Sequence, residues 1–460
     1  MSRVLLPALL ALAAACATPP KPAPVAPPPE LPAPKKLTDA EIAALAPSHP
    51  TFNKDVAPIV FKHCANCHHP GEVAPFALLS YEDVAKRAEQ IVRVTGNRFM
   101  PPWKPVHGYN EFADPRNLSD TELATLAAWA KAGAPRGDGS PPEAPTFPEG
   151  WQLGKPDLII KLPEPFSVPA EGEDVYRCFV IPLGLAGDKD IAAVEFRPGN
   201  RKVVHHMLTF LDTKGAARKR DEADPGPGYK SFGGPGFQPQ GGLGGWVPGA
   251  VARWLPEDLA RKVVKGSDLV LQMHYHPTGK PEVDQSEVGL YFAKKPAAKG
   301  LYQLPLVKAD LKIPAGAKRH REYVSFTLPI ELEVVSAAAH MHLLGQEMRV
   351  WATLPDGKVE PLLWINDWDF GWQGEYPFKK AIRLPKDTKL EMEAYYDNSD
   401  ENPFNPNNPP RQVTWGEATT EEMALAFVFF ATPNPEDRVT LMKAMVWQLQ
   451  LWKFMKELNR

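Results

Sequence analysis

The chain has 460 residues, 43% of them hydrophobic and 23% charged, so it is long enough for two to four domains and apolar enough to bury a core in each. The formal net charge is −3, because 52 Lys and Arg residues stand against 55 Asp and Glu residues. This balance excludes a strongly basic nucleic-acid-binding protein, and we expect no nucleic acid as a partner.

The first 16 residues are typical of an export signal, with Arg3 ahead of an apolar run. The run is shorter than the ~20 residues that a membrane-spanning helix needs. It ends at Ala13-Ala14-Ala15-Cys16, which resembles a bacterial lipobox except that Leu12 stands four positions before the cysteine instead of three. We expect a lipidated Cys16 that anchors the protein to a membrane in the periplasm or cell envelope. The alternative is ordinary signal cleavage and secretion.

Residues 17–37 are rich in Pro and Ala and predict an extended stalk. Residues 38–134 predict a small helical domain, because capping-box patterns open helices at Thr38 and at Ser119. A second stretch rich in Pro and Gly, residues 135–150, predicts a linker.

The helical segment contains a CxxCH motif, Cys64-Ala65-Asn66-Cys67-His68. The two thiols would add to the vinyl groups of a haem and His68 would ligate its iron, so we predict one covalently attached haem c and assign 38–134 as a cytochrome c domain. A zinc or redox CxxC site is the alternative.

Met100 is the expected second axial ligand of this haem, in a Pro-held loop that resembles the methionine loop of class I cytochrome c domains. A Met/His pair favours an electron carrier over an oxygen binder. His107 and His69 are the alternative ligands, with Met100 then a core residue.

From residue 151 onwards, short alternating or β-branched runs are separated by clusters of Pro, Gly, Asn and Asp. This texture predicts antiparallel strands rather than an alternating βαβ fold. The region is long for one sandwich, so we predict two jelly-roll-like β-sandwich domains, 151–303 and 304–432. Residues 433–460 predict a C-terminal helix whose stripe docks on the β module, with a membrane or a partner as the alternative contact; the stripe is Leu441, Met445, Leu449 and Trp452.

Three histidine-rich runs of the β region have spacings that suit metal binding: His205-His206, His274 with His276, and His340 with His342. Residues i and i+2 of a strand share one face, so His340 and His342 can chelate one metal. Adjacent His205 and His206 point to opposite faces unless a bulge or a strand end intervenes. The alternative is hydrogen-bonded core histidines, which three separate runs disfavour. Imidazole-rich sites without cysteine suit copper, zinc, iron or nickel.

These runs, together with Tyr176-Arg177-Cys178 and Glu421 to Phe427, resemble the copper type II, ascorbate-dependent monooxygenases over about residues 160–430. That family includes dopamine β-monooxygenase and the peptidylglycine α-hydroxylating enzymes. The resemblance implies two copper ions on two sandwich domains. The implied ligands are His205, His206 and His274 at an electron-transferring site, and His340, His342 and Met423 at an oxygen-binding site. His276 is implied to support the site without ligating the metal.

Some positions depart from this family. The peptide-amidating members have an arginine and a tyrosine, which help to hold a substrate carboxylate, where this chain has Ala338 and Phe427. Peptide amidation is therefore not expected. The family's disulfides are also missing, since Cys178 has no partner once the other cysteines carry lipid and haem. The run from Asn366 to Phe370 predicts either a pocket wall or a structural turn.

The sequence therefore predicts an exported copper monooxygenase that hydroxylates a C–H bond of a small organic substrate with O2. We expect its electrons to come through its own haem from an ascorbate-like reductant or a redox protein. The alternative is a non-enzymatic haem–copper electron carrier or a periplasmic redox or oxygen sensor. Met423 favours the enzyme, because a pure carrier has no need of an open, thioether-bearing copper.

Overall fold

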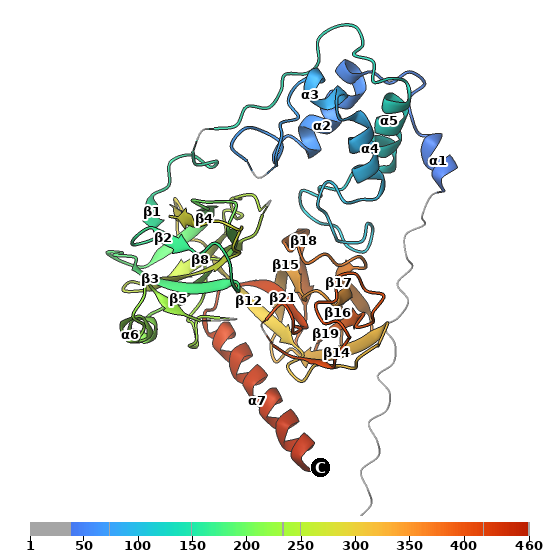
Figure 1. Ribbon diagram of the computed structural model, residues 1–460. Helices are drawn as coiled ribbons and strands as arrows, with labels where there is room; N and C mark the ends of the chain where they lie inside the picture. Colours follow the sequence, from blue (N-terminus) through green and yellow to red (C-terminus); the bar gives the residue numbers. More distant parts are fainter. Residues whose placement is uncertain are drawn as a thin grey trace, which may run out of the picture. The chain divides into compact units, whose positions relative to one another are not determined.

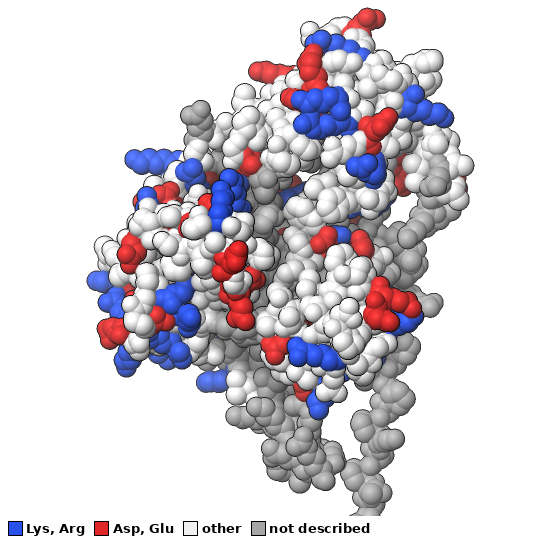
Figure 2. All heavy atoms as spheres, viewed as in Figure 1, with Lys and Arg blue, Asp and Glu red and all other residues white. Residues whose placement is uncertain are grey.

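The computed structural model describes residues 38–458 except 73, 149, 232, 233, 249 and 417. The predicted export signal (1–16) and Pro-rich stalk (17–37) lie outside the described residues. In the part of the chain that is described, no helix has the length and apolar character needed to cross a membrane. Positive and negative side chains are both spread over the face drawn in Figure 2, in keeping with the small net charge.

The first described segment is built from short helices: α1 (Asp39–Ala43), η1 (Phe52–Val56), α2 (Ala57–His63), α3 (Tyr81–Ala85), α4 (Ala88–Gly96) and α5 (Asp120–Lys131). Both predicted capping boxes are present, one between Thr38 and Glu41 and one between Ser119 and Glu122. Phe52, Leu126 and Trp129 are central to the core that these helices enclose. A cytochrome c domain in this segment stays a prediction.

The β region is organised around one eight-stranded sheet with the order β1-β11-β4-β8-β12-β21-β15-β18 (Figure 1). Its strands are β1 (Leu158–Lys161), β4 (Lys189–Arg197), β8 (Leu259–Val263), β11 (Glu287–Phe292), β12 (Lys299–Val307), β15 (Leu332–His340), β18 (Glu375–Leu384) and β21 (Leu425–Thr432). Neighbouring strands are antiparallel except β8 and β12, which pair in parallel.

Two smaller sheets each cover one half of the long sheet. A five-stranded sheet packs on the β1 half, with strands β3 (Val175–Pro182), β5 (Val204–Asp212), β6 (Tyr229–Lys230), β7 (Gly245–Trp246) and β9 (Asp268–Tyr275). A four-stranded sheet packs on the β18 half, with strands β14 (His320–Thr327), β16 (Gly345–Thr353), β17 (Val359–Ile365) and β19 (Lys389–Tyr396). Short pairs of strands, β2 (Phe166–Val168) with β10 (Glu282–Asp284) and β13 (Lys312–Ile313) with β20 (Val413–Thr414), and the helix α6 (Ala216–Ala223) complete the region.

Each half of the long sheet thus has its own core. Ile191 and Val263 of the long sheet pack with Phe179 and Met207 of the five-stranded sheet, and this unit is the first sandwich. In the second sandwich, Leu304, Val334 and Val428 pack with Val350 and Met392. The predicted antiparallel β-sandwich architecture is therefore present. The predicted domain boundary between residues 303 and 304 falls inside β12. This strand belongs to both sandwiches, because it pairs with β8 of the first and with β21 of the second.

Two further segments pack on the second sandwich. In the loop between α4 and α5, the Val106 N–H donates to the Trp364 carbonyl at 2.7 Å, and Phe112 belongs to the second core. In α7 (Glu436–Leu458), Leu441 and Met445 pack against the same core. The predicted docking of the terminal helix is confirmed for these two side chains. The side chains of Leu449 and Trp452 lie outside the described ones.

Candidate metal centre

His205, His206 and His274 converge from two neighbouring strands, β5 and β9. The register between these strands shifts between Val204 and His206, which marks a bulge. A bulge lets consecutive side chains reach the same side of a strand. The bulge that the adjacent His205 and His206 require is therefore present. One ring nitrogen from each of the three histidines lies within 4.8 Å of the others. His206 Nδ1 is 3.4 Å from His205 Nδ1 and 3.2 Å from His274 Nδ1.

The Asp174 carboxylate orients the His274 ring of this group. It lies 2.7 Å from His274 Nε2 and 2.7 Å from His276 Nδ1. Burial raises the pKa of Asp174, but hydrogen bonds from His274 and His276 outweigh burial and bring the pKa to about 2. A carboxylate only accepts, so His274 donates from Nε2 and keeps the lone pair of Nδ1 for the group. His276 contacts Asp174 and is not a member of the three-histidine group.

His205 and His206 are held in the neutral form. Burial, and then the neighbouring His274, lower the pKa of His205 to about 4, and the same causes lower the pKa of His206 well below its usual value. The ring of Tyr176 stacks on His274 with a centroid distance of 4.2 Å. Neutral imidazole is the form that binds metal ions.

His340 and His342 form a second group at the end of β15. His340 Nδ1 donates to Gln373 Oε1 at 2.6 Å, and His342 Nδ1 donates to the Glu421 carbonyl at 3.1 Å. In both rings Nδ1 has a partner, so Nε2 is the nitrogen that could bind a metal. Burial lowers the pKa of His340, and burial together with His340 lowers the pKa of His342 to about 4. Met423, only 8% exposed, lines the same cavity as these two histidines.

Glu422 is a buried carboxyl between His342 and Met423. It accepts backbone N–H groups from His342 at 2.8 Å, from Leu344 at 2.6 Å and from Met423 at 3.0 Å. Burial raises the pKa of Glu422 to about 8, although these hydrogen bonds lower it. One side chain therefore fixes the backbone of two predicted ligands.

Phe370 contacts both histidine groups. Its ring centroid is 5.7 Å from that of His205 and 5.9 Å from that of His342. Both groups and Phe370 line one cavity of about 1740 Å³. Near Phe370, the Asp369 carboxylate accepts the Gly371 N–H at 2.9 Å. Of the run from Asn366 to Phe370, only Phe370 lines the cavity.

The CxxCH segment has features that fit a covalently attached haem. Cys64 and Cys67 are free and partly buried; burial, with a smaller contribution from Cys67, raises the pKa of Cys64 to about 12. His68 Nδ1 donates to the Phe76 carbonyl at 3.1 Å, which leaves Nε2 available as an axial ligand. In the described residues, neither cysteine belongs to a group of three or more His, Cys, Asp or Glu ligands. That finding gives no support to a zinc site here.

The candidates for the second axial ligand differ in their surroundings. Met100 is partly exposed and its N–H donates to the Val94 carbonyl at 2.9 Å. The His69 ring stacks on Phe147 with a centroid distance of 3.8 Å. His107 is exposed, and its Nδ1 lies 3.3 Å from Asn117 Nδ2. Met100 as the ligand stays a prediction.

The sequence predicted the ligand candidates but missed the groups that hold them. Asp174 lies in a loop and has no periodic spacing to the histidines. Glu422 has Glu421 beside it, so the sequence does not distinguish the buried carboxyl from the other. Their positions along the chain were the available signal. Asp174 stands two residues before the Tyr176-Arg177-Cys178 motif, and Glu422 lies inside the run from Glu421 to Phe427.

No protein-family model and no curated protein matches the chain. Among solved structures, the chain is similar to the major capsid protein P2 from bacteriophage PM2, with 8% identity and a TM-score of 0.25 over 56% of this chain and 97% of that one. It is also similar to PNGF-II, with 9% identity and a TM-score of 0.23 over 59% of each chain. For the PBCV-1 virus capsid, the identity is 7% and the TM-score 0.22 over 60% of this chain and 94% of that one. These likenesses are too low to carry an argument about function.

Proposed function

We propose that the chain is an exported, copper-dependent monooxygenase that hydroxylates a C–H bond of a small organic substrate. In the overall reaction, one atom of O2 enters the C–H bond and the other is reduced to water by two electrons and two protons. The observation that carries the proposal is that two separate groups of imidazoles line one cavity, and that the buried thioether of Met423 lines it as well. Copper bound to these groups would supply one-electron redox chemistry and a coordination position for O2.

The residues of the first group suit electron transfer. His205, His206 and His274 offer three like ligands, and Asp174 holds His274 in one tautomer. His205 and His206 lie at the bulge of β5, so the sheet holds the backbone of both proposed ligands. A rigid set of ligands changes little between two oxidation states, which favours rapid exchange of single electrons.

The residues of the second group suit oxygen chemistry. Gln373 and the Glu421 carbonyl hold His340 and His342 through Nδ1, so that Nε2 would be the ligand atom. The Met423 thioether is a soft ligand that favours reduced copper, and three protein ligands leave a position open. Glu422 holds the backbone of His342 and Met423 at a fixed spacing.

The helical segment would provide the electrons. Cys64 and Cys67 would hold a haem c covalently, with His68 and Met100 as axial ligands, and the haem would supply single electrons drawn from an ascorbate-like reductant or a redox protein. The Glu72 carboxylate, five residues after Cys67, pairs with the Arg201 guanidinium four residues before His205. This ion pair ties the haem segment to the strand that carries two of the proposed ligands. A lipid on Cys16 would anchor the protein in the periplasm or cell envelope.

Metal and product analysis of the purified full chain tests the proposal. We expect two copper ions and one haem per chain, and O2 consumption that yields a hydroxylated product from members of a panel of small organic compounds. His340→Ala should remove one copper, whereas His320→Ala, at a histidine that pairs with Glu322 at 2.9 Å, should leave both. Fewer than two coppers in the intact chain, or O2 uptake that no compound stimulates, would favour a non-enzymatic electron carrier.

A further inference from the structure

β21 has two apolar faces, whereas an outer face of a sandwich strand is usually polar. Ala426 and Val428 point into the second core. Leu425 and Phe427 alternate with them and therefore lie on the opposite face of the long sheet. Polar residues would occupy these positions if the face met water, so the face needs an apolar cover of its own.

Only part of this face is covered by protein. Phe429 and Ala431 are buried in a small cluster with Leu259 and Leu301. The cavity borders the whole face, because Leu425, Phe427, Phe429 and Ala431 all line it.

The partly exposed part of the face is the surface that we call the apolar wall. Its residues Phe427 and Ala338 also pack against the edge of that cluster. Leu425 and Phe427 are partly exposed and line the cavity with Met423. Ala338 and Pro305, the partners of Phe427 on the two adjacent strands, line it as well. Met423 lies two residues before the start of β21, so the wall extends from Met423 along this strand.

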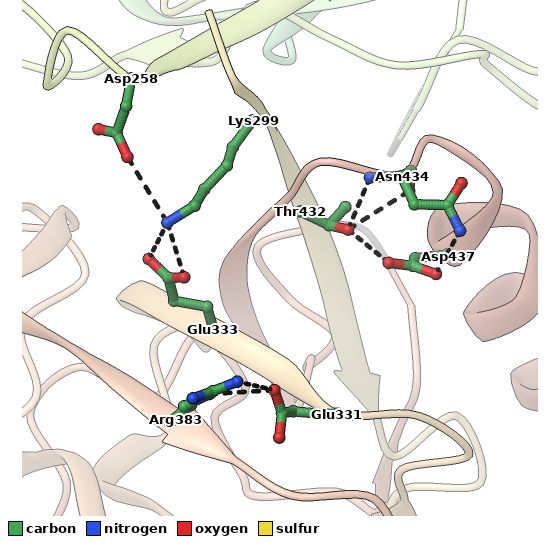
Figure 3. A network of polar contacts seen from close by, with 8 residues as sticks. All are labelled: Asp258, Lys299, Glu331, Glu333, Arg383, Thr432, Asn434 and Asp437. Carbon is green, nitrogen blue, oxygen red and sulfur yellow. Dashed lines mark hydrogen bonds and ion pairs between the residues drawn. The ribbon is translucent and has the colours of Figure 1, made fainter.

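Two of the cations that line the cavity, Arg261 and Lys299, are paired with carboxylates. Arg261 Nη2 lies 3.9 Å from Glu375, whose carboxylate also accepts the Ser336 hydroxyl at 2.6 Å. Figure 3 shows the Lys299 ammonium between two carboxylates, 2.8 Å from Glu333 and 3.5 Å from Asp258. A charged ligand would have to compete with these pairs, whereas a neutral apolar one would not.

We propose that the apolar wall binds the hydrocarbon part of a neutral organic substrate and directs one end of it toward Met423. This inference rests on the proposed function, because it takes the Met423 end of the wall to be the reacting end. Each CH2 that moves from water onto the wall should raise the affinity about fourfold.

Equilibrium binding to the copper-loaded full chain tests this inference. The probes are 1-butanol, 1-hexanol and 1-octanol, each displacing the neutral fluorophore Nile red. We expect Kd to fall about fourfold per CH2. Octanoate and octylamine should bind no more tightly than 1-octanol.

Variants locate the binding surface. Phe427→Ser should weaken 1-octanol at least tenfold, and Phe427→Leu should stay within threefold of the wild type. Phe404→Ser is the matched control, because Phe404 is 68% exposed and does not line the cavity. Ala338→Ser, which adds one hydroxyl to the wall, replaces Phe427→Ser if that variant fails to fold.

The inference is overturned if affinity does not depend on chain length, or if both wall variants bind like the wild type. It is also overturned if octanoate binds more than tenfold tighter than 1-octanol and Arg261→Met abolishes that gain, because the site then recognises an anion. Copper is counted in the same samples. If two coppers bind but the affinity for the alcohols does not depend on their chain length, the binding role of the apolar wall is refuted and the proposed function is not. If the affinity depends on chain length but the chain binds no copper, the proposed function is refuted and the binding role of the wall is not.

Discussion

Asn in place of Asp174 tests how the first histidine group is held. Each oxygen of the Asp174 carboxylate accepts from one histidine, His274 or His276. An amide has one acceptor oxygen and a donor NH2 group, so it cannot serve both rings. The Asp174→Asn variant should therefore leave His274 free to turn or to change its tautomer.

The size of the effect follows from the exposure of Asp174. Loss of an outer partner of a metal-bound histidine costs 10–100-fold in metal affinity, or about 1.4–2.7 kcal/mol. The amide keeps one acceptor, and the Asp174 side chain is 24% exposed, so water replaces part of the lost hydrogen bonding. We expect the lower limit, about tenfold, or ~1.4 kcal/mol.

Competition of reduced copper between the protein and a chromogenic chelator measures this affinity. The site of His340, His342 and Met423 serves as the internal control and should change less than threefold. Glu173→Gln removes the same charge from the adjacent, exposed position and should change neither site. An unchanged affinity in Asp174→Asn, or an equal loss in Glu173→Gln, would refute the reasoning.

Two further predictions address the space between the sites and the acid stability of the first sandwich. Phe370→Ala removes the ring that contacts both His205 and His342. It should slow electron exchange between the two copper sites at least tenfold while both coppers stay bound, whereas Phe370→Tyr should leave the rate unchanged. Rapid-freeze paramagnetic resonance measures this rate in both variants. Backbone N–H groups of Lys230 and Gly226, with Arg177, lower the pKa of Asp224 from its usual 3.8 to about 2. The ionised Asp224 carboxylate therefore contributes fully to the free energy of unfolding above pH 4, and this contribution is lost as the pH falls through 2. Asp224→Asn should lower Tm at pH 6 by about 2–4 °C, the effect of ~1 kcal/mol, and a difference that persists at pH 2 by circular dichroism would contradict the assignment.

Local patterns in the sequence were sufficient to predict the ligand candidates. The i, i+2 spacing of His340 and His342 predicts side chains on one face of a strand. Their ring centroids lie 5.2 Å apart, although β15 ends at His340. The adjacent pair His205-His206 required a bulge, and the shifted register between β5 and β9 provides one. Their roles as copper ligands stay predictions.

Features that depend on distant pairing were not predictable. The parallel pairing of β8 with β12 joins two sandwiches into one sheet, and nothing in the strand pattern indicates which strand lies next to which. The role of Asp174 depends on a contact with a residue 100 positions away. The apolar outer face of β21 was visible as an unbroken apolar run, but such a run also fits a strand buried on both faces.

X-ray absorption at the copper edge of the reduced, fully loaded chain tests the central proposal most directly. We expect two coppers per chain and one sulfur scatterer, contributed by Met423. In Met423→Ala, we expect the sulfur signal and the hydroxylating activity to disappear while the copper at His205, His206 and His274 remains. A spectrum without sulfur in the wild type, or full hydroxylating activity in the variant, would contradict the account.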